Sequence, residues 1–196
     1  MDNQLIREIV ETHGTPAYLF DTDIFGTRIE NIRKIMGGRA DICYAMKANP
    51  FLTEAAAKTA DSLEVCSHGE YSICRQLLVD ADKLVLSGVN KDKTEILEVM
   101  REAGVGTYTA ESLQQLFNLE SCAMECDLTQ VPVLIRLSSG NQFGKDEATV
   151  YDVVANRRRY AHLEFVGIQF YSGTQKKKLE KIEKELCLLD AFCTQL

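Results

Sequence analysis

Short apolar runs alternate along the chain with stretches in which apolar residues recur every three or four positions. The runs are rich in β-branched residues, and the first four centre near residues 44, 65, 86 and 107, a step of about 21 residues. Such runs predict buried strands, and the stretches between them predict amphipathic helices. Strands are expected at residues 42–46, 63–67, 84–88, 105–109, 132–137 and 164–171. Helices are expected at residues 53–59, 70–79, 91–103, 110–122 and 175–196.

A strand followed by a helix, repeated in this way, predicts a parallel α/β array. Residues 1–36 are interpreted as a strand (15–21) and a helix (22–36) that lead into it, and residues 37–196 as the array itself. Only six strands of this type are present, whereas a closed (β/α)8 barrel has eight strands and about 250 residues. The expected fold is therefore a TIM-type (β/α)8 barrel that lacks its last strands.

Charge and composition narrow the function classes. The chain has 29 acidic and 22 basic residues and a net charge of −7, which argues against a nucleic-acid or anionic-membrane surface. No apolar run approaches the roughly 18 residues that a membrane span needs, and the N-terminus is polar. Seven cysteines without CxxC or Cys/His spacing predict reduced thiols and no metal site. A soluble, cytoplasmic protein is expected.

Candidate chemistry lies at the strand ends, because the loops after parallel strands hold the ligand in such folds. Lys47 follows the first strand, where an ammonium needs either a partner or a lowered pKa. A neutral amine there would suit Schiff-base chemistry with an aldehyde, although a lysine that snorkels to solvent explains it equally well. Glu64, within the next strand, likewise needs a cation or a hydrogen-bond donor.

Three further strand ends carry polar residues. Ser67–Glu70 fits a helix N-cap, which is the simpler interpretation. Arg136, in an apolar strand, suits a fixed anionic or phenolate oxygen. Residues 172–174, Ser-Gly-Thr, predict either an anion site at a helix N-terminus or an ordinary turn with a cap.

Residues 44–50, Tyr-Ala-Met-Lys-Ala-Asn-Pro, resemble the Tyr-x-x-Lys-Ala-Asn segment of the fold-type III pyridoxal-phosphate enzymes. That family contains diaminopimelate, ornithine and arginine decarboxylases and, more distantly, alanine racemase. The resemblance runs from residue 14 to residue 175 and implies that Lys47 forms a Schiff base with pyridoxal 5'-phosphate. The residues that it assigns to the cofactor are Lys47, Glu64, Ser67, Glu70, Asn90, Arg136, Tyr171, Gly173 and Thr174.

The sequence also departs from the family pattern. Gln169 and Tyr171 stand where the family has two histidines, and Asn141-Gln142 replaces a Ser-Lys pair, which removes a cation. These changes resemble divergent members, some of which decarboxylate an amino acid tethered to a carrier protein. The family's seventh and eighth strands and its β-rich second domain have no counterpart, and they hold much of the phosphate site.

The resemblance implies a homodimeric decarboxylase with a small amino-acid substrate. Three alternatives stay open: a racemase on the same barrel, which needs a second base opposite Lys47, a cofactor-binding protein without turnover, and an inactive fragment. The basic runs 157–159 and 176–178 are expected to be solvated faces, and a docking surface for an acidic carrier protein is the alternative.

Overall fold

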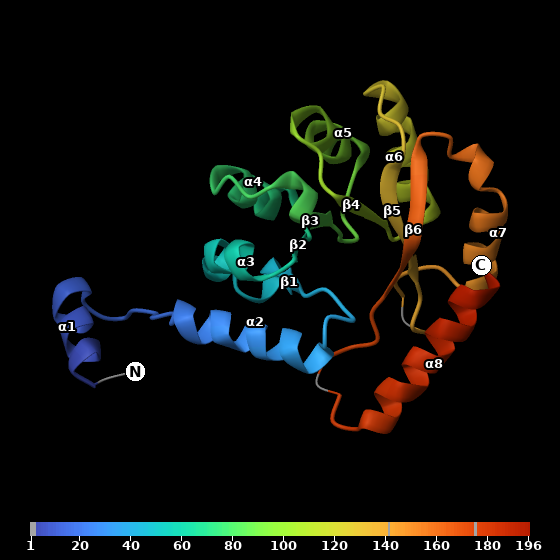
Figure 1. Ribbon diagram of the computed structural model, residues 1–196. Coiled ribbons are helices and arrows are strands. Elements are labelled where there is room, and N and C mark those ends of the chain that lie inside the picture. Colours follow the sequence, from blue (N-terminus) through green and yellow to red (C-terminus); the bar gives the residue numbers. More distant parts are fainter. Residues whose placement is uncertain (1–2, 141, 175) are drawn as a thin grey trace.

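The computed structural model describes residues 3–140, 142–174 and 176–196 (Figure 1). Its centre is one six-stranded sheet in which the spatial order of the strands follows the chain and every neighbouring pair is parallel. The strands are β1 (Cys43–Ala45), β2 (Ser62–Val65), β3 (Leu84–Leu86), β4 (Thr107–Ala110), β5 (Val131–Leu137) and β6 (Leu163–Phe170). The sheet is open, with β1 and β6 at its edges, so the expected partial barrel is confirmed.

Helices connect the strands, and five of the described helices begin at a side-chain cap. They are α1 (Asn3–His13), α2 (Thr22–Met36), α3 (Thr53–Thr59), α4 (His68–Gln76), α5 (Lys93–Glu102), α6 (Leu113–Glu125), α7 (Glu147–Ala155) and α8 (Leu179–Gln195). The side chains of Asp21, Ser67, Asp92, Ser112 and Asp146 each accept the backbone N–H three residues further on. These caps fix the start of α2, α4, α5, α6 and α7 relative to the strand ends.

The strand register separates two faces of the sheet. Residues paired in register point to the same face, so Leu63 and Leu84 lie together on the face that packs against the helices, where both are fully buried. On the other face, which corresponds to the lumen of a barrel, Glu64 pairs with Ala45 on β1. Arg136 pairs with Gln169 on this face too. The lumen face is only partly buried and carries the polar side chains.

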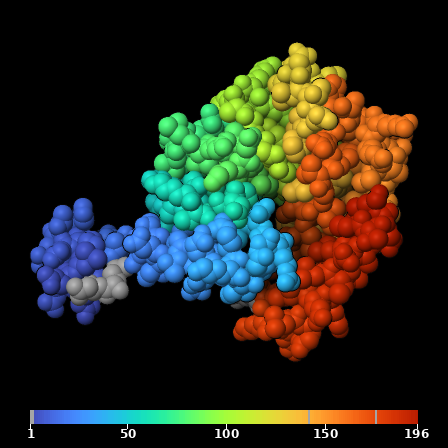
Figure 2. Space-filling model, in the orientation of Figure 1, coloured from blue at the N-terminus to red at the C-terminus, as the bar shows by residue number. Residues whose placement is uncertain are grey.

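The N-terminal residues stand apart from the sheet. Figures 1 and 2 show α1 projecting from the body of the molecule, and no residue of this helix is buried. Residues 14–21 connect it to α2 without forming a strand, and Tyr18 is 89% exposed. The predicted strand at 15–21 is therefore wrong, because no neighbouring strand lies beside this segment to pair with it.

α2 is joined to the sheet by an ion pair. Arg33 Nη2 lies 2.8 Å from Asp61 Oδ1 and donates to the Thr59 carbonyl at 3.1 Å. Asp61 also accepts the Ile42 N–H, and that hydrogen bond, together with Arg33, lowers the pKa of the Asp61 carboxyl. α2 therefore packs where the chain enters β1.

The predicted elements match the structure closely along the array. All six strands are confirmed, with ends that differ by about two residues or fewer, and the helix at 53–59 is confirmed over its length. α1 and α7 were not predicted. The last predicted helix begins at Leu179, and Gln175, where it was expected to start, lies outside the described residues. Within the described ranges, no helix is long and apolar enough to cross a membrane.

Candidate active site

Three of the predicted site residues meet where the strands end. Lys47 lies in the 3-10 turn Met46–Ala48 that directly follows β1. Its Nζ atom is 3.6 Å from Oε2 of Glu64 on β2 and 6.0 Å from the ring centroid of Tyr171, which follows β6. The first, second and last strands thus contribute to one site on the lumen face of the sheet.

Glu64 determines the charge of Lys47. Burial lowers the pKa of the Lys47 amine, but the neighbouring negative groups, with Glu64 foremost, outweigh burial and leave the pKa above its ordinary value. Of the possibilities raised by the sequence, the structure shows a partner and a side chain that reaches solvent, since Lys47 is 59% exposed, and it does not show a lowered pKa. The amine therefore has to lose a proton before it can act as a nucleophile.

Ser87, which the sequence interpretation did not single out, supports Glu64. It follows β3, is 2% exposed, and its Oγ donates a hydrogen bond to Glu64 Oε1 at 2.8 Å. The same hydroxyl lies 3.2 Å from Cys66 Sγ, whose pKa is raised by burial. Because Oε2 faces Lys47 and Oε1 is held by Ser87, the Glu64 carboxylate has one defined orientation.

Ser67 and Glu70 form the start of α4. The Ser67 hydroxyl accepts the Glu70 N–H at 3.2 Å, and Glu70 Oε2 accepts the Cys66 N–H at 2.7 Å. Ser67 therefore caps α4, which confirms the N-cap interpretation, and Glu70 reaches back to the residue before the cap. Asn90 lies exposed in the turn between β3 and α5.

Arg136 belongs to a buried cluster of charged residues that was not predicted and that also contains Lys91, Glu111 and Lys145. Its Nη1 donates to Oε2 of Glu111, the residue that directly follows β4. Oε1 of Glu111 lies 3.8 Å from Lys91 Nζ, and the Glu111 and Lys91 side chains are each 3% exposed. The anion expected for this strand arginine is therefore supplied from within the chain.

Lys145 adds a third cation. It is 6% exposed, and its Nζ donates to the Ala110 carbonyl at 3.1 Å. Burial lowers the pKa of Lys91 and of Lys145 to about 8 each. Burial also opposes ionisation of Glu111, but Arg136 and Lys91 outweigh it and lower the pKa of that carboxyl. Glu111 was missed because an acid before a helix start is usual. Lys91 and Lys145 also precede helix starts, where a cation is disfavoured, and the sequence interpretation did not use this signal.

The segment after β6 carries Tyr171, Gly173 and Thr174. The Ser139 hydroxyl donates to the Tyr171 carbonyl at 2.7 Å, which fixes the backbone at this point. Gly173 has a φ of +101°, in the left-handed region that favours glycine, and both Gly173 and Thr174 are exposed.

The helix start expected directly after residues 172–174 is wrong, while an anion site at these residues stays a prediction. α8 begins only at Leu179, so the free N–H groups of its first turn lie beyond this segment. Ser172 instead donates to Glu185 Oε2 on α8 at 2.9 Å, and Lys176 binds the same carboxylate. The expectation that Lys176 is solvated is also wrong, while Lys177 and Lys178 are exposed.

Asn141 and Gln142 are the two residues at which the sequence predicts the loss of a cation. Asn141 lies outside the described residues. Gln142 is exposed, and the neighbouring Phe143 ring lies 5.3 Å from the Arg136 guanidinium carbon. At this distance the ring face attracts the cation. The loop after β5 therefore contributes an aromatic ring beside Arg136.

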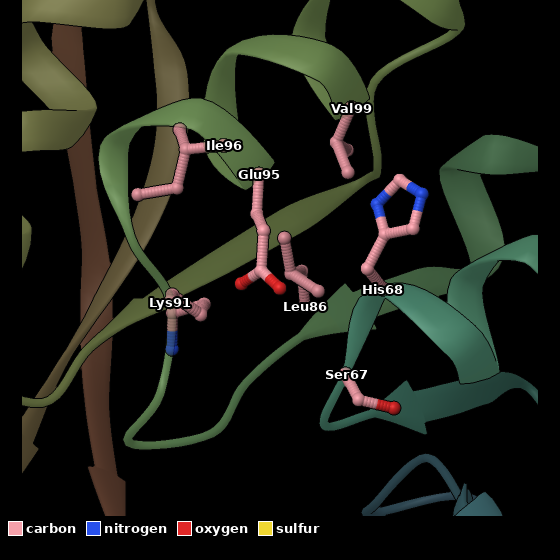
Figure 3. A pocket seen from close by; sticks show the side chains of 7 residues that line it. All are labelled: Ser67, His68, Leu86, Lys91, Glu95, Ile96 and Val99. Atoms are coloured by element: carbon pink, nitrogen blue, oxygen red, sulfur yellow. The ribbon is translucent and has the colours of Figure 1, made fainter.

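A small cavity adjoins the site at the start of α4 and α5 (Figure 3). Its volume is about 10 Å³, and it is lined by Ser67, His68, Leu86, Lys91, Glu95, Ile96 and Val99. Figure 3 shows that the Lys91 amine points away from Ile96 and Val99. The cavity has room for about one water molecule. Over the described residues, no three His, Cys, Asp or Glu side chains are grouped to hold a metal ion.

Comparisons with known proteins identify a family and relatives that match the chain. Residues 23–196 match the family described as "Pyridoxal-dependent decarboxylase, pyridoxal binding domain". Diaminopimelate decarboxylase of Mycobacterium bovis is 28% identical, over 87% of this chain and 42% of its own length. L-glutamyl-[BtrI acyl-carrier protein] decarboxylase of Niallia circulans is 27% identical, over 93% of this chain and 46% of its own length.

Solved structures share the fold. The crystal structure of diaminopimelate decarboxylase from Helicobacter pylori complexed with L-lysine matches with a TM-score of 0.79 and 25% identity, over 94% of this chain and 54% of that one. The chain spans less than half the length of the two relatives described above.

Proposed function

Since the chain belongs to the pyridoxal-dependent decarboxylase family, through its pyridoxal-binding domain, we propose that it binds pyridoxal 5'-phosphate on the lumen face of its sheet. We further propose that the protein removes the α-carboxylate of an amino acid as CO₂. The observation that carries the proposal is the Lys47–Glu64 pair at the end of β1 and β2, which faces the Tyr171 ring across the site.

The residues present fit this cofactor. The lumen face offers an amine on Lys47, an aromatic ring on Tyr171 and a guanidinium on Arg136. Gln169 Oε1 is buried and has no hydrogen-bond partner in the described part of the chain, so a donor on a ligand would satisfy it. Thr174 presents an exposed hydroxyl and Gly173 an exposed stretch of backbone, both of which suit a phosphate.

When bound, pyridoxal phosphate supplies an aldehyde for a Schiff base with a lysine amine and a ring that withdraws electrons from the substrate. Lys47 provides the amine, and Glu64 Oε2, 3.6 Å away, is the carboxylate placed to take its proton. Ser87 holds Glu64 in that position. The Tyr171 ring stacks against a flat ligand and excludes water from one side of it.

A carrier-tethered amino acid is a second candidate for the form of the substrate. It is supported by the likeness to the Niallia circulans enzyme and by the exposed side chains of Lys177 and Lys178, which follow Tyr171 closely in the sequence. Reversing the charge of both lysines should weaken the affinity for an acidic carrier protein and leave the turnover of the untethered amino acid unchanged. An unchanged carrier affinity would exclude this docking surface.

Borohydride reduction tests the proposed function. The complete product of the gene is incubated with pyridoxal phosphate, reduced, digested and mapped by mass spectrometry. The adduct should lie on Lys47 and be absent from Lys47→Arg, whereas Lys58→Arg, a change to an exposed lysine on α3, should leave it unchanged. An adduct on another residue would contradict the assignment. Release of CO₂ from an amino acid, measured beside the chirality of the recovered substrate, separates decarboxylation from racemisation.

A further inference from the structure

The carboxylate of Glu111 joins the ends of three strands. Its Oε1 accepts the N–H of Gly88, in the turn after β3, and the hydroxyl of Thr109 on β4, both at 3.0 Å. Its Oε2 accepts from Arg136 on β5. Gln115 on α6 accepts the Glu111 N–H at 2.9 Å. Glu111 is therefore held from several sides in a place that water does not reach.

Two hydrogen-bonded routes lead from Glu111 to the candidate active site. One is the direct pair with Arg136 on the lumen face. The other runs from Gly88 to its neighbour Ser87, whose hydroxyl holds Glu64. The turn between them has little freedom, because a Cβ on Gly88 would lie 2.5 Å from the Cys66 carbonyl oxygen.

Glu111 holds Arg136 by an ion pair, and the other charges around Glu111 strengthen the need for this pair. Lys91 and Lys145 act on the same carboxylate, so three cations surround one anion. A guanidinium stays protonated in proteins, whereas a buried lysine can lose its charge. Without Glu111, Arg136 would be a partly buried cation facing two other basic groups, and it would turn toward solvent.

We propose that Glu111 is a positioning residue of the cofactor site, which orients Arg136 and steadies the Ser87–Gly88 turn without itself touching the cofactor. This inference rests on the proposed function. It assigns a role to a buried residue in the loop after β4. It also makes the affinity for pyridoxal phosphate depend on the Glu111–Arg136 ion pair.

Glu111→Gln distinguishes the two routes, because it should keep the contact with Gly88 and break the contact with Arg136. The amide oxygen still accepts the Gly88 N–H and the Thr109 hydroxyl, but the amide NH₂ turns two donors toward Arg136, which is itself only a donor. We expect the Kd for pyridoxal phosphate, measured by fluorescence titration, to rise about tenfold or more, the effect of losing roughly 1.4 kcal/mol of binding free energy.

Glu120→Gln is the matched control. Glu120 is also a poorly exposed carboxylate paired with a base, since its Oε1 lies 2.7 Å from His162 Nδ1, but it is on α6, outside the candidate site. This change should lower the thermal stability of the protein and alter the Kd for pyridoxal phosphate by less than about twofold. Loss of affinity in the Glu111 variant alone would then be specific to its position.

A double-mutant cycle shows whether the effect passes through Arg136. Glu111→Gln should cost about tenfold in affinity in the unaltered protein and less than about twofold in an Arg136→Met background. Glu111→Asp, which keeps the buried charge but withdraws it from Arg136, should give an intermediate loss and serves if the glutamine variant does not fold. Equal losses in both backgrounds, or an aspartate variant that binds as well as the unaltered protein, would overturn the inference. Failure of the unaltered protein to bind pyridoxal phosphate would instead overturn the proposed function on which it rests.

Discussion

Replacing Lys145 with methionine is expected to stabilise the protein. Lys145 is 6% exposed, and burial lowers the pKa of its amine from 10.5 to about 8. At about 1.4 kcal/mol per pKa unit, the buried charge costs roughly 3 kcal/mol of folding free energy at about pH 7. Methionine removes this cost but leaves the Ala110 carbonyl without its hydrogen bond, a loss of about 1 kcal/mol. The net gain should be about 2 kcal/mol.

The pH dependence of that gain is the sharper test. Between the folded and unfolded pKa values of Lys145, the unfolded chain holds a proton that the folded chain has released, so the stability of the unaltered protein rises with pH there. Urea unfolding should show the advantage of Lys145→Met falling by about 2 kcal/mol from about pH 7 to about pH 9.5. Lys91 and Glu111 are present in both proteins, so their contributions to the pH dependence largely cancel in the stability difference. An advantage that stays constant over this range, or a methionine variant less stable at about pH 7, would refute the reasoning.

Substitutions at three further positions test the neighbouring contacts. Gly88→Ala should destabilise the protein by about 2 kcal/mol or more in urea unfolding, because its Cβ would meet the Cys66 carbonyl and its φ is +105°. Ser87→Ala removes the hydrogen bond to Glu64 and should weaken pyridoxal phosphate binding about fivefold in a titration, equivalent to roughly 1 kcal/mol. Tyr171→Phe keeps the stacking ring and should bind within about twofold of the unaltered protein, whereas Tyr171→Ala should bind about tenfold more weakly.

The sheet was predictable because its signals are local. Each strand is a short apolar run, and in a barrel of the (β/α)8 type the strand order follows the chain, so Leu84–Leu86 and Val131–Leu137 could be placed without knowing their neighbours. Residues 15–21 have a similar composition, but whether they form a strand depends on a partner elsewhere in the molecule. That information is non-local, and no pattern within the segment contains it.

The site was predictable only where a residue type is unusual for its place. Lys47, Glu64 and Arg136 lie in or beside apolar strands, where a charged residue is unusual and therefore identifies a candidate site residue. Glu111 and Ser87 carry no such mark, since an acid before a helix and a serine before a glycine occur in many turns. Their importance comes from contacts between successive strand ends, which depend on the register of the sheet.

The bending of the sheet sets the width of the site. Six strands laid flat at about 4.8 Å spacing would hold β1 and β6 about 24 Å apart. The amine of Lys47 nevertheless lies 6.0 Å from the ring of Tyr171, and a lysine side chain spans only part of the difference. The register shift between β5 and β6 at Val133 and Leu134 is the kind of irregularity that increases curvature. The curvature of the sheet thus sets the distance between the Lys47 amine and the Tyr171 ring, and with it the thickness of a ligand that fits between them.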